Sequence, residues 1–167
     1  MSKIERTLVL FKPDAVQRGI VGEILTRFER VGLKIVGTKM LAPDNQHYAT
    51  HYEEIGKLAT RISQTVYENT LAMMAQGPVI AMVLEGIDAA ELVRKLVGST
   101  EPKAAAPGTI RGDYSHMSYA HADDANIALR NILHASGDAS DAKQEVALWF
   151  TDDELYDYTV LHEKFTR

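Results

Sequence analysis

The sequence lacks cysteine altogether, and this absence removes several classes of protein from consideration. A chain without cysteine has no disulfide framework, no thiol nucleophile and no cysteine-bound zinc. Long hydrophobic runs are missing too: the longest, Val79–Leu84, is far shorter than the roughly 18 residues of a membrane span. The first apolar run, Leu8–Phe11, is shorter than the core of about 7–15 residues in a signal peptide. We therefore expect a cytoplasmic enzyme or binding domain.

An excess of positive charge is absent as well. The 18 Lys and Arg residues are outnumbered by 23 Asp and Glu residues, which gives a net charge of −5. This balance argues against general binding of nucleic acids or anionic membranes, although it allows a local basic pocket. The glycine-rich phosphate-binding motifs GxxxxGK[ST] and GxGxxG are both missing. Any phosphate group would therefore have to be held by Lys, Arg and hydroxyl side chains.

The residues that are present suit one packed domain. The chain has 167 residues, of which 46% are hydrophobic, and we expect a single domain spanning residues 1–167. Apolar and β-branched runs predict strands at residues 7–11, 33–41 and 79–84, and a short apolar element at 131–134. Helical spacing predicts helices near residues 20–31, 44–55, 60–74, 88–97 and 140–148, and a last one from 152. Strands that alternate with helices favour an α/β or α+β sandwich.

Capping residues and loops divide these elements. Asp44, Asp88 and Ser140 each precede a helical pattern and are predicted to be N-caps. Residues 98–112 hold prolines, glycines and an alanine run, and they are too apolar for a solvated linker. We predict a long ordered loop there. Residues 113–124 are polar and are predicted to be an excursion on the surface.

Four side chains next to breaks in the predicted elements are suited to gripping phosphate. Lys12 ends the first strand, Arg94 lies on the helix before the long loop, and Thr100 follows it. Arg111 stands in a stretch that has little other reason to be cationic. Lysine binds phosphate as a point charge, and arginine binds it as a bidentate fork. For each residue alone, however, a solvated surface charge is the simpler interpretation.

His134 is the most suggestive of the six histidines. It follows two apolar residues and has small neighbours, so we expect a partly buried ring with space around it. A neutral imidazole can act as a nucleophile if a partner holds its other nitrogen. Asn131 and Ser136 offer hydrogen bonds nearby, and Glu145 could fix the tautomer. A purely structural histidine remains the simpler interpretation of this segment by itself.

The other histidines carry weaker signals. One group resembles a loose metal cluster, although its spacing matches no specific site and decoration of a loop is the simpler interpretation. Its members are His116, His121, Asp123 and Asp124. The remaining histidines are expected on the surface or on helix faces, namely His47, His51 and His162.

Taken together, these segments resemble the nucleoside diphosphate kinase family. Five motifs follow in the family's order, and the resemblance runs from Glu5 to about Tyr158. The matching segments are residues 5–19, Gly77-Pro78-Val79, residues 107–113, Asn131-x-x-His134-x-Ser136, and Glu145 with Leu148-Trp149-Phe150. The resemblance implies a ferredoxin-like α/β (α+β) sandwich, with helices packed on a four-stranded antiparallel sheet. It also implies transfer of the terminal phosphate of a nucleoside triphosphate, typically ATP, to a nucleoside diphosphate.

The family motifs assign roles to individual residues. His134 matches the nucleophile, which would carry the phosphoryl group as a pros-phosphohistidine between the two halves of a ping-pong reaction. Glu145 and Ser136 match residues that orient His134, and Tyr52 matches an aromatic residue beside it. The matches to nucleotide-binding positions are Lys12, Arg94, Thr100, Arg111 and Asn131, with Tyr67 for base stacking.

The resemblance also implies a cofactor and partners. Mg²⁺ is expected on the nucleotide phosphates, without a dedicated protein ligand. A homo-oligomer, either tetramer or hexamer, is expected, with residues 101–112 in subunit contacts. Neither a membrane nor a specific nucleic acid is expected as a partner. The alternative is a catalytically silent nucleotide sensor or scaffold of the same fold, and the presence of His134 together with Lys12 and Arg111 argues for an active enzyme.

Three departures from the family pattern carry open questions. Gly137 stands where the family commonly has Asp, and the adjacent Asp138 could compensate. The family's base-stacking phenylalanine has no match between residues 53 and 76, where Tyr67 is the nearest aromatic and Val66 the alternative. Residues 114–126 form an insertion that could act as a flap or an oligomer contact, or be an inert surface loop.

Overall fold

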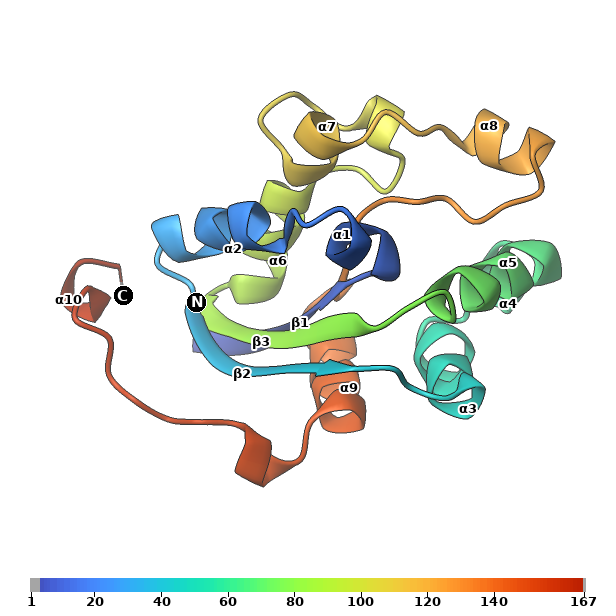
Figure 1. Ribbon diagram of the computed structural model, residues 1–167. Coiled ribbons are helices and arrows are strands. Elements are labelled where there is room, and N and C mark those ends of the chain that lie inside the picture. The colour runs from blue at the N-terminus through green and yellow to red at the C-terminus, as the bar shows by residue number, and fades with distance from the viewer. Residues whose placement is uncertain (1–3, 167) are drawn as a thin grey trace.

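A computed structural model describes residues 4–166, with a four-stranded antiparallel sheet at its centre (Figure 1). In spatial order the strands are β2 (Lys34–Leu41), β3 (Val79–Ile87), β1 (Ile4–Phe11) and β4 (Leu133–Ala135). β1 pairs with β3 along its full length, from Ile4 opposite Ile87 to Phe11 opposite Ile80. This sheet and the helices packed on it confirm the predicted sandwich.

Helices cover both faces of the sheet. Figure 1 shows α2 and α6 on one face and α9 across the other. The α-helices are α1 (Pro13–Gln17), α2 (Val21–Arg30), α3 (Asn45–Ala49), α4 (Leu58–Arg61), α5 (Gln64–Met74), α6 (Ala89–Val97), α7 (Ile110–Tyr114), α8 (Tyr119–Asp124), α9 (Ala139–Trp149) and α10 (Glu163–Thr166). A π-helical segment, η1 (Thr50–Ile55), follows α3, and 3₁₀ turns occupy Pro102–Ala104 and Asp152–Glu154.

The central strand β1 serves two hydrophobic cores. Successive side chains of a strand point to opposite faces of its sheet. Val9 and Phe11 accordingly join the core beneath α2 and α6, whereas Leu8 and Leu10 join the core around Trp149. All five side chains are at most 2% exposed. The burial of β1 on both faces explains why its sequence is a continuous apolar run rather than an alternating one.

The predicted N-caps have different outcomes. Asp44 is confirmed, because its Oδ1 accepts a 2.8 Å hydrogen bond from a backbone N–H in the first turn of α3. Asp88 precedes α6 as predicted, but its side chain makes no capping hydrogen bond. The prediction that Ser140 is an N-cap was wrong, because α9 begins one residue before Ser140 and Asp138 is the N-cap. Oδ1 of Asp138 accepts hydrogen bonds from the backbone N–H groups of Ser140 and Asp141, at 2.7 and 2.9 Å.

The polar stretch predicted as a surface excursion contains a helix, α8, of six residues. Its N-cap is Ser118, whose Oγ accepts a 3.2 Å hydrogen bond from the backbone N–H of His121. Such a short polar helix shows no apolar periodicity, so the sequence pattern does not reveal it. Within residues 4–166, no helix is long and apolar enough to cross a membrane.

Candidate active site

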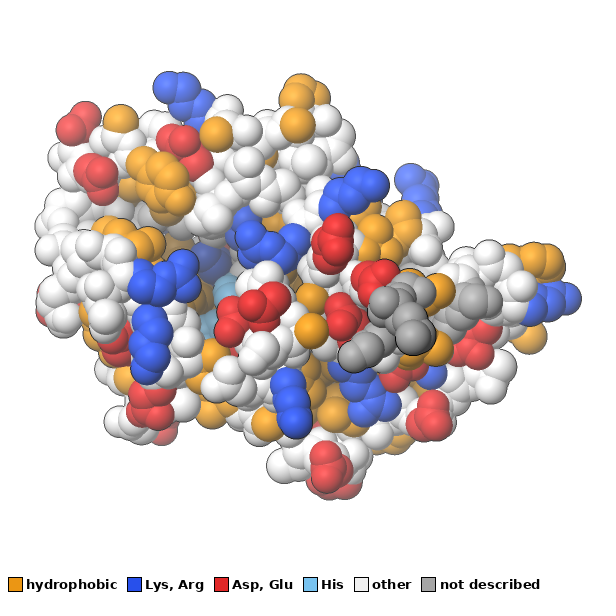
Figure 2. Space-filling model, turned by 180° about the vertical axis from the view of Figure 1, so that it is seen from behind, with side chains coloured by type: hydrophobic (Ala, Val, Ile, Leu, Met, Phe, Trp, Pro, Cys, Tyr) orange, Lys and Arg blue, Asp and Glu red, His pale blue; other side chains and the backbone are white. Residues whose placement is uncertain are grey.

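One cavity of about 390 Å³ is lined by residues from η1, from the helices α4 to α9, from β4 and from the loops between them, together with Lys12 just after β1. It contains most of the residues that the sequence singled out: Lys12, Tyr52, Arg94, Thr100, Arg111, Asn131, His134 and Glu145. Figure 2 shows this hollow with a histidine at its floor and Lys and Arg side chains around its rim. Ser136 lies behind the lining, and its contact with Glu145 is described below.

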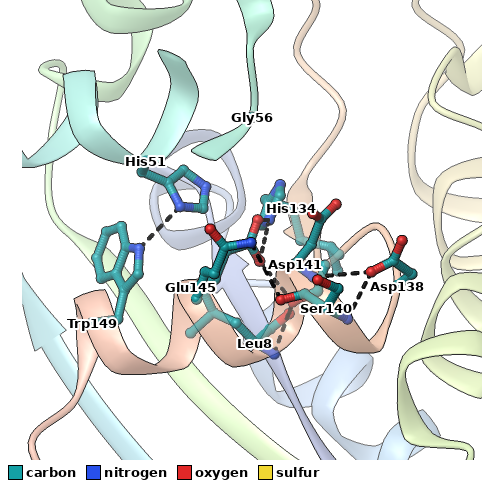
Figure 3. Close-up of polar contacts among 12 residues, drawn as sticks. Leu8, His51, Gly56, His134, Asp138, Ser140, Asp141, Glu145 and Trp149 are labelled. Atoms are coloured by element: carbon teal, nitrogen blue, oxygen red, sulfur yellow. Dashed lines mark hydrogen bonds and ion pairs between the residues drawn. The ribbon is translucent and has the colours of Figure 1, made fainter. Parts of the chain in front are cut away.

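The His134 ring is held by one nitrogen. Its Nε2 lies 2.9 and 3.0 Å from the two carboxylate oxygens of Glu145 (Figure 3). Ser136 Oγ donates a 2.6 Å hydrogen bond to Glu145 Oε2 and accepts one from the backbone N–H of Leu8 at 3.1 Å. Because a carboxylate can only accept, the proton of the neutral ring belongs on Nε2. The lone pair is then on Nδ1, the pros nitrogen.

His51 is a site residue that the sequence did not reveal. It was expected on the surface or on a helix face; it lies in a helical segment but is only 1% exposed, and its ring lies 4.5 Å from that of His134, nearly perpendicular to it. Trp149 Nε1 donates a 3.1 Å hydrogen bond to His51 Nδ1. Burial, followed by the nearby His134, lowers the pKa of His51 well below its usual value, so the ring is neutral. His51 lies in η1, where π-helical winding breaks the 3.6-residue period on which helix-face arguments depend.

Tyr52, the next residue of η1, lies where the sequence predicted it. It is 8% exposed, and its ring centroid is 6.4 Å from that of His134. Burial raises the pKa of the Tyr52 hydroxyl, so the side chain stays neutral. His51 and Tyr52 together form an apolar, aromatic flank beside the reacting ring.

Two of the cationic side chains that line the cavity, Lys12 and Arg111, are buried close to one another, whereas Arg61 and Arg94 are exposed. Lys12 Nζ donates a 2.6 Å hydrogen bond to Asn131 Oδ1, and burial together with Arg111 lowers the pKa of Lys12 to about 8. The guanidinium of Arg111 donates to the backbone carbonyls of Asn131 and Leu133, at 3.1 and 2.7 Å. Burial, then Arg94, lowers the pKa of Arg111 to about 10. Both lowered pKa values indicate that the charged forms of Lys12 and Arg111 are disfavoured in the empty cavity. A bound anion would stabilise these charged forms.

Tyr67 is not brought to the cavity. It packs, partly buried, against the core that contains Trp149, whereas the alternative, Val66, lines the cavity. Successive residues of a helix point in directions about 100° apart, so Val66 and Tyr67 cannot face the same space. Two further apolar residues close to Val66 in the chain, Leu58 and Ile62, also line the cavity.

The carboxylate that lines the cavity near Gly137 belongs to Asp141 and not to Asp138, which the sequence suggested as a replacement for the missing acid. The carboxylate of Asp138 caps α9, and Asp138 is not among the residues that line the cavity. Asp141, in the first turn of α9, does line it. A Cβ atom at Gly137 would collide with Asp141 Oδ2, so the two positions compete for one space. Burial, then Asp138 and Glu145, raises the pKa of Asp141.

Within residues 4–166, one group of side chains has the proximity of a metal site. The ligand atoms of His51, His134 and Glu145 lie within 4.8 Å of one another. His51 Nδ1 and His134 Nε2 are already hydrogen-bonded, however, and Mg²⁺ prefers oxygen ligands. The loose cluster considered from the sequence, around His116 and His121, does not form such a group among the described residues.

Comparison with known proteins gives one consistent result. The family model described as "Nucleoside diphosphate kinase" matches residues 5–155. Proteins of that name from Borreliella burgdorferi and Pyrococcus furiosus are 41% and 44% identical, over 93% and 100% of this chain and 92% and 96% of theirs.

Solved structures agree with these sequence matches. A nucleoside-diphosphate kinase from Borrelia burgdorferi, a transition state mimic with bound vanadate and ADP, has a TM-score of 0.92 at 41% identity. The match covers 96% of this chain and 95% of that one. A halophilic nucleoside diphosphate kinase from Halobacterium salinarum, in complex with CDP, has a TM-score of 0.83 at 39% identity and covers 99% of each chain.

Proposed function

The chain belongs to the nucleoside diphosphate kinase family and has that family's activity, and from this premise we propose that His134 carries the phosphoryl group between two nucleotides. The observation that carries the proposal is the pairing of Glu145 with Nε2, which leaves Nδ1 as the reacting atom. A held and oriented imidazole is the arrangement that nucleophilic catalysis requires.

Each half of the reaction is one displacement at phosphorus. The Nδ1 lone pair of His134 forms a bond to the terminal phosphorus of the triphosphate, while the bond from that phosphorus to the bridging oxygen breaks. The nucleoside diphosphate leaves with that electron pair. In the second half, a terminal oxygen of another diphosphate displaces the histidine and restores its lone pair. The Nε2 proton stays in place throughout, because the Glu145 carboxylate accepts its hydrogen bond and Ser136 holds that carboxylate in position.

The buried cations are proposed to position the phosphates and to stabilise the charge that moves with the transferred group. Phosphoryl transfer depends more on in-line positioning and electrostatic stabilisation than on bond-making by the protein. Lys12 and Arg111 form the inner part of this grip, and Arg94 and Thr100 form its outer part. Asn131 joins the two parts, since its side chain accepts from Lys12 and donates to the backbone carbonyl of Thr100 at 2.9 Å.

Mg²⁺ is proposed to enter on the nucleotide phosphates. The cavity offers it no cage of carboxylates, because Glu145 is committed to His134 and Ser136. Among the described residues that line the cavity, Asp141 is the carboxylate whose side chain makes no hydrogen bond or ion pair, and it could contact a cation bound to phosphate. When bound, the cation neutralises phosphate charge during transfer.

The assembly and location are also proposed. We propose a homo-oligomer, tetramer or hexamer, with residues 101–112 in subunit contacts, formed by a single domain of residues 1–167 in the cytoplasm. Sedimentation velocity on the full chain tests the assembly, and cell fractionation tests the location. The silent sensor is not favoured, because the chain retains His134 and its charged surroundings.

An exchange experiment tests the double displacement. An enzyme that forms a phosphoenzyme exchanges labelled ADP into ATP without any other nucleotide present. We expect this exchange for the wild type and for the control His121→Ala, whose side chain is exposed outside the cavity. We expect none for His134→Ala. Exchange that persists in His134→Ala would contradict the proposed role of this residue.

A further inference from the structure

The insertion at residues 114–126 reaches the active-site cavity through one side chain, that of Tyr119. Building on the proposed function, we propose that Tyr119 contacts the base of the bound nucleotide and supplies the aromatic surface that the α4–α5 side of the cavity lacks. The insertion would then be a wall of the nucleotide site.

The segment that carries Tyr119 is fixed to two neighbouring parts of the molecule. The backbone N–H of Tyr119 donates a 2.9 Å hydrogen bond to Glu101 Oε1, in the loop that follows α6. At the far end of α8, Asn69 Nδ2 of α5 donates to Asn126 Oδ1 at 3.1 Å. Figure 1 shows α8 at the same end of the molecule as α4 and α5. These anchors give the insertion a defined position beside the cavity, as a wall requires.

Two unlike groups of side chains line the cavity around α4, α5 and the insertion. The α4–α5 side contributes the aliphatic Leu58, Ile62 and Val66 with the polar Arg61 and Thr70, and no aromatic side chain. The insertion and the segment after it contribute Tyr119 and Leu129 to the lining. A base is flat and apolar on both faces, so the aliphatic and aromatic side chains of this lining suit it, and stacking on an aromatic ring tolerates every base.

Tyr119 also lies next to the phosphate grip. It is close enough to Arg111 to affect the pKa of that guanidinium in the raising direction. Tyr119 is 46% exposed and lines the cavity, so part of its surface is open to a ligand there. A nucleotide whose terminal phosphates lie against Lys12 and Arg111 would extend outward past this ring. The aromatic contact is therefore placed on the insertion, in α8, and not on α5, where Tyr67 was expected.

Binding experiments on the full chain separate the base from the phosphates. Calorimetry would measure the affinities of ADP and of inorganic tripolyphosphate, which has neither base nor sugar, for the wild type, Tyr119→Ala and Tyr119→Phe. We expect Tyr119→Ala to weaken ADP by about fivefold or more and to leave tripolyphosphate unchanged, since loss of base stacking has effects of that order. Tyr119→Phe should bind ADP as the wild type does. His121→Ala, on the same helix but outside this cavity, is the matched control.

Two results would overturn the inference. ADP affinity unchanged in Tyr119→Ala would show that the ring makes no contact with the base. An equal loss for ADP and tripolyphosphate would show that Tyr119 acts through Arg111 or through the fold. If Tyr119→Ala does not fold, Tyr119→Gln, which keeps side-chain bulk but has neither an aromatic nor an aliphatic face for the base, takes its place with the same outcomes. Failure of the proposed function would be seen separately, as wild-type protein that performs no ADP–ATP exchange.

Discussion

At the scale of the residue, hydrogen bonds to neighbouring side chains fix the orientation of the groups in the active site. Glu145 fixes Nε2 of His134, and Ser136 fixes Glu145 to β1. The residue types could be predicted from the sequence, because five motifs in order identify the family. The hydrogen-bond partners of His51 and Asp138 could not be predicted from the sequence. A π-helical turn changes the direction of the His51 side chain, and the earlier start of α9 makes Asp138 its N-cap.

The depressed pKa of Lys12 predicts how nucleotide binding depends on pH. With a pKa of about 8 in the free protein, Lys12 loses its charge as the pH rises through that value. Bound phosphates favour the charged form, so binding takes up a proton above this pH and affinity falls as pH rises. Calorimetry of ADP binding in two buffers of different ionisation enthalpy would detect both effects. Affinity and heat that do not change between about pH 7 and pH 9.5 would refute the assignment.

The competition between Gly137 and Asp141 predicts a compensating pair of substitutions. Gly137→Asp alone should lower kcat and stability, because the new side chain collides with the Asp141 carboxylate. Adding Asp141→Ser should restore part of both losses, since neighbouring substitutions of this kind are coupled. Steady-state kinetics and urea unfolding of the two single variants and the double variant would measure the coupling. Additive losses in the double variant would show that the two positions do not share one space.

At the scale of the element, long apolar strands were predictable and short polar helices were not. β1 and β3 follow directly from their apolar runs, with bounds extended by a few residues. The start of α9 was misplaced because Asp138 and Ser140 are both good capping residues, and only the backbone decides between them. The helix α8 has too few apolar residues for a pattern, so the position of Tyr119 required the structure.

The N-cap of α9 gives a prediction that separates stability from catalysis. Asp138→Ala should lower the free energy of unfolding by about 1 kcal/mol, because two backbone N–H groups lose their acceptor. The kcat should change little, since the Asp138 side chain caps the helix and does not line the cavity. Ser140→Ala is the matched control, because its side chain is exposed and does not provide the cap. A large loss of kcat with unchanged stability would mean that Asp138 replaces the missing acid after all.

At the scale of the whole molecule, the fold brings together residues far apart in the chain. β1 lies between β3 and β4, so Lys12 at its end meets Asn131 just before β4, 119 positions away. Beyond α9 the chain returns to the free edge of β2, where Tyr156 N–H donates to the Val36 carbonyl at 2.7 Å. Family motifs predict which residues gather, but their order gives no distances between them, and it does not predict the C-terminal segment that runs along the edge of β2.

The tail along β2 predicts a stability effect remote from the site. The Tyr158 hydroxyl donates a 2.6 Å hydrogen bond to the Ile35 carbonyl. Tyr158→Phe should lower the free energy of unfolding by roughly 0.5–1.5 kcal/mol, the usual net value of such a bond. Tyr156→Phe, at a side chain that is 66% exposed, should have a smaller effect. Urea unfolding would compare them, and equal effects would argue against a tail held by Tyr158.

The most direct test of the account is to identify the phosphorylated nitrogen. Wild-type protein would be loaded with ATP and Mg²⁺, and the isomer of the phosphohistidine would be read by ³¹P and ¹⁵N NMR of the intact phosphoenzyme. Because Glu145 occupies Nε2, the account predicts a single phosphohistidine at His134 with the phosphorus on Nδ1. Phosphorus on Nε2, or on any other residue, would contradict it.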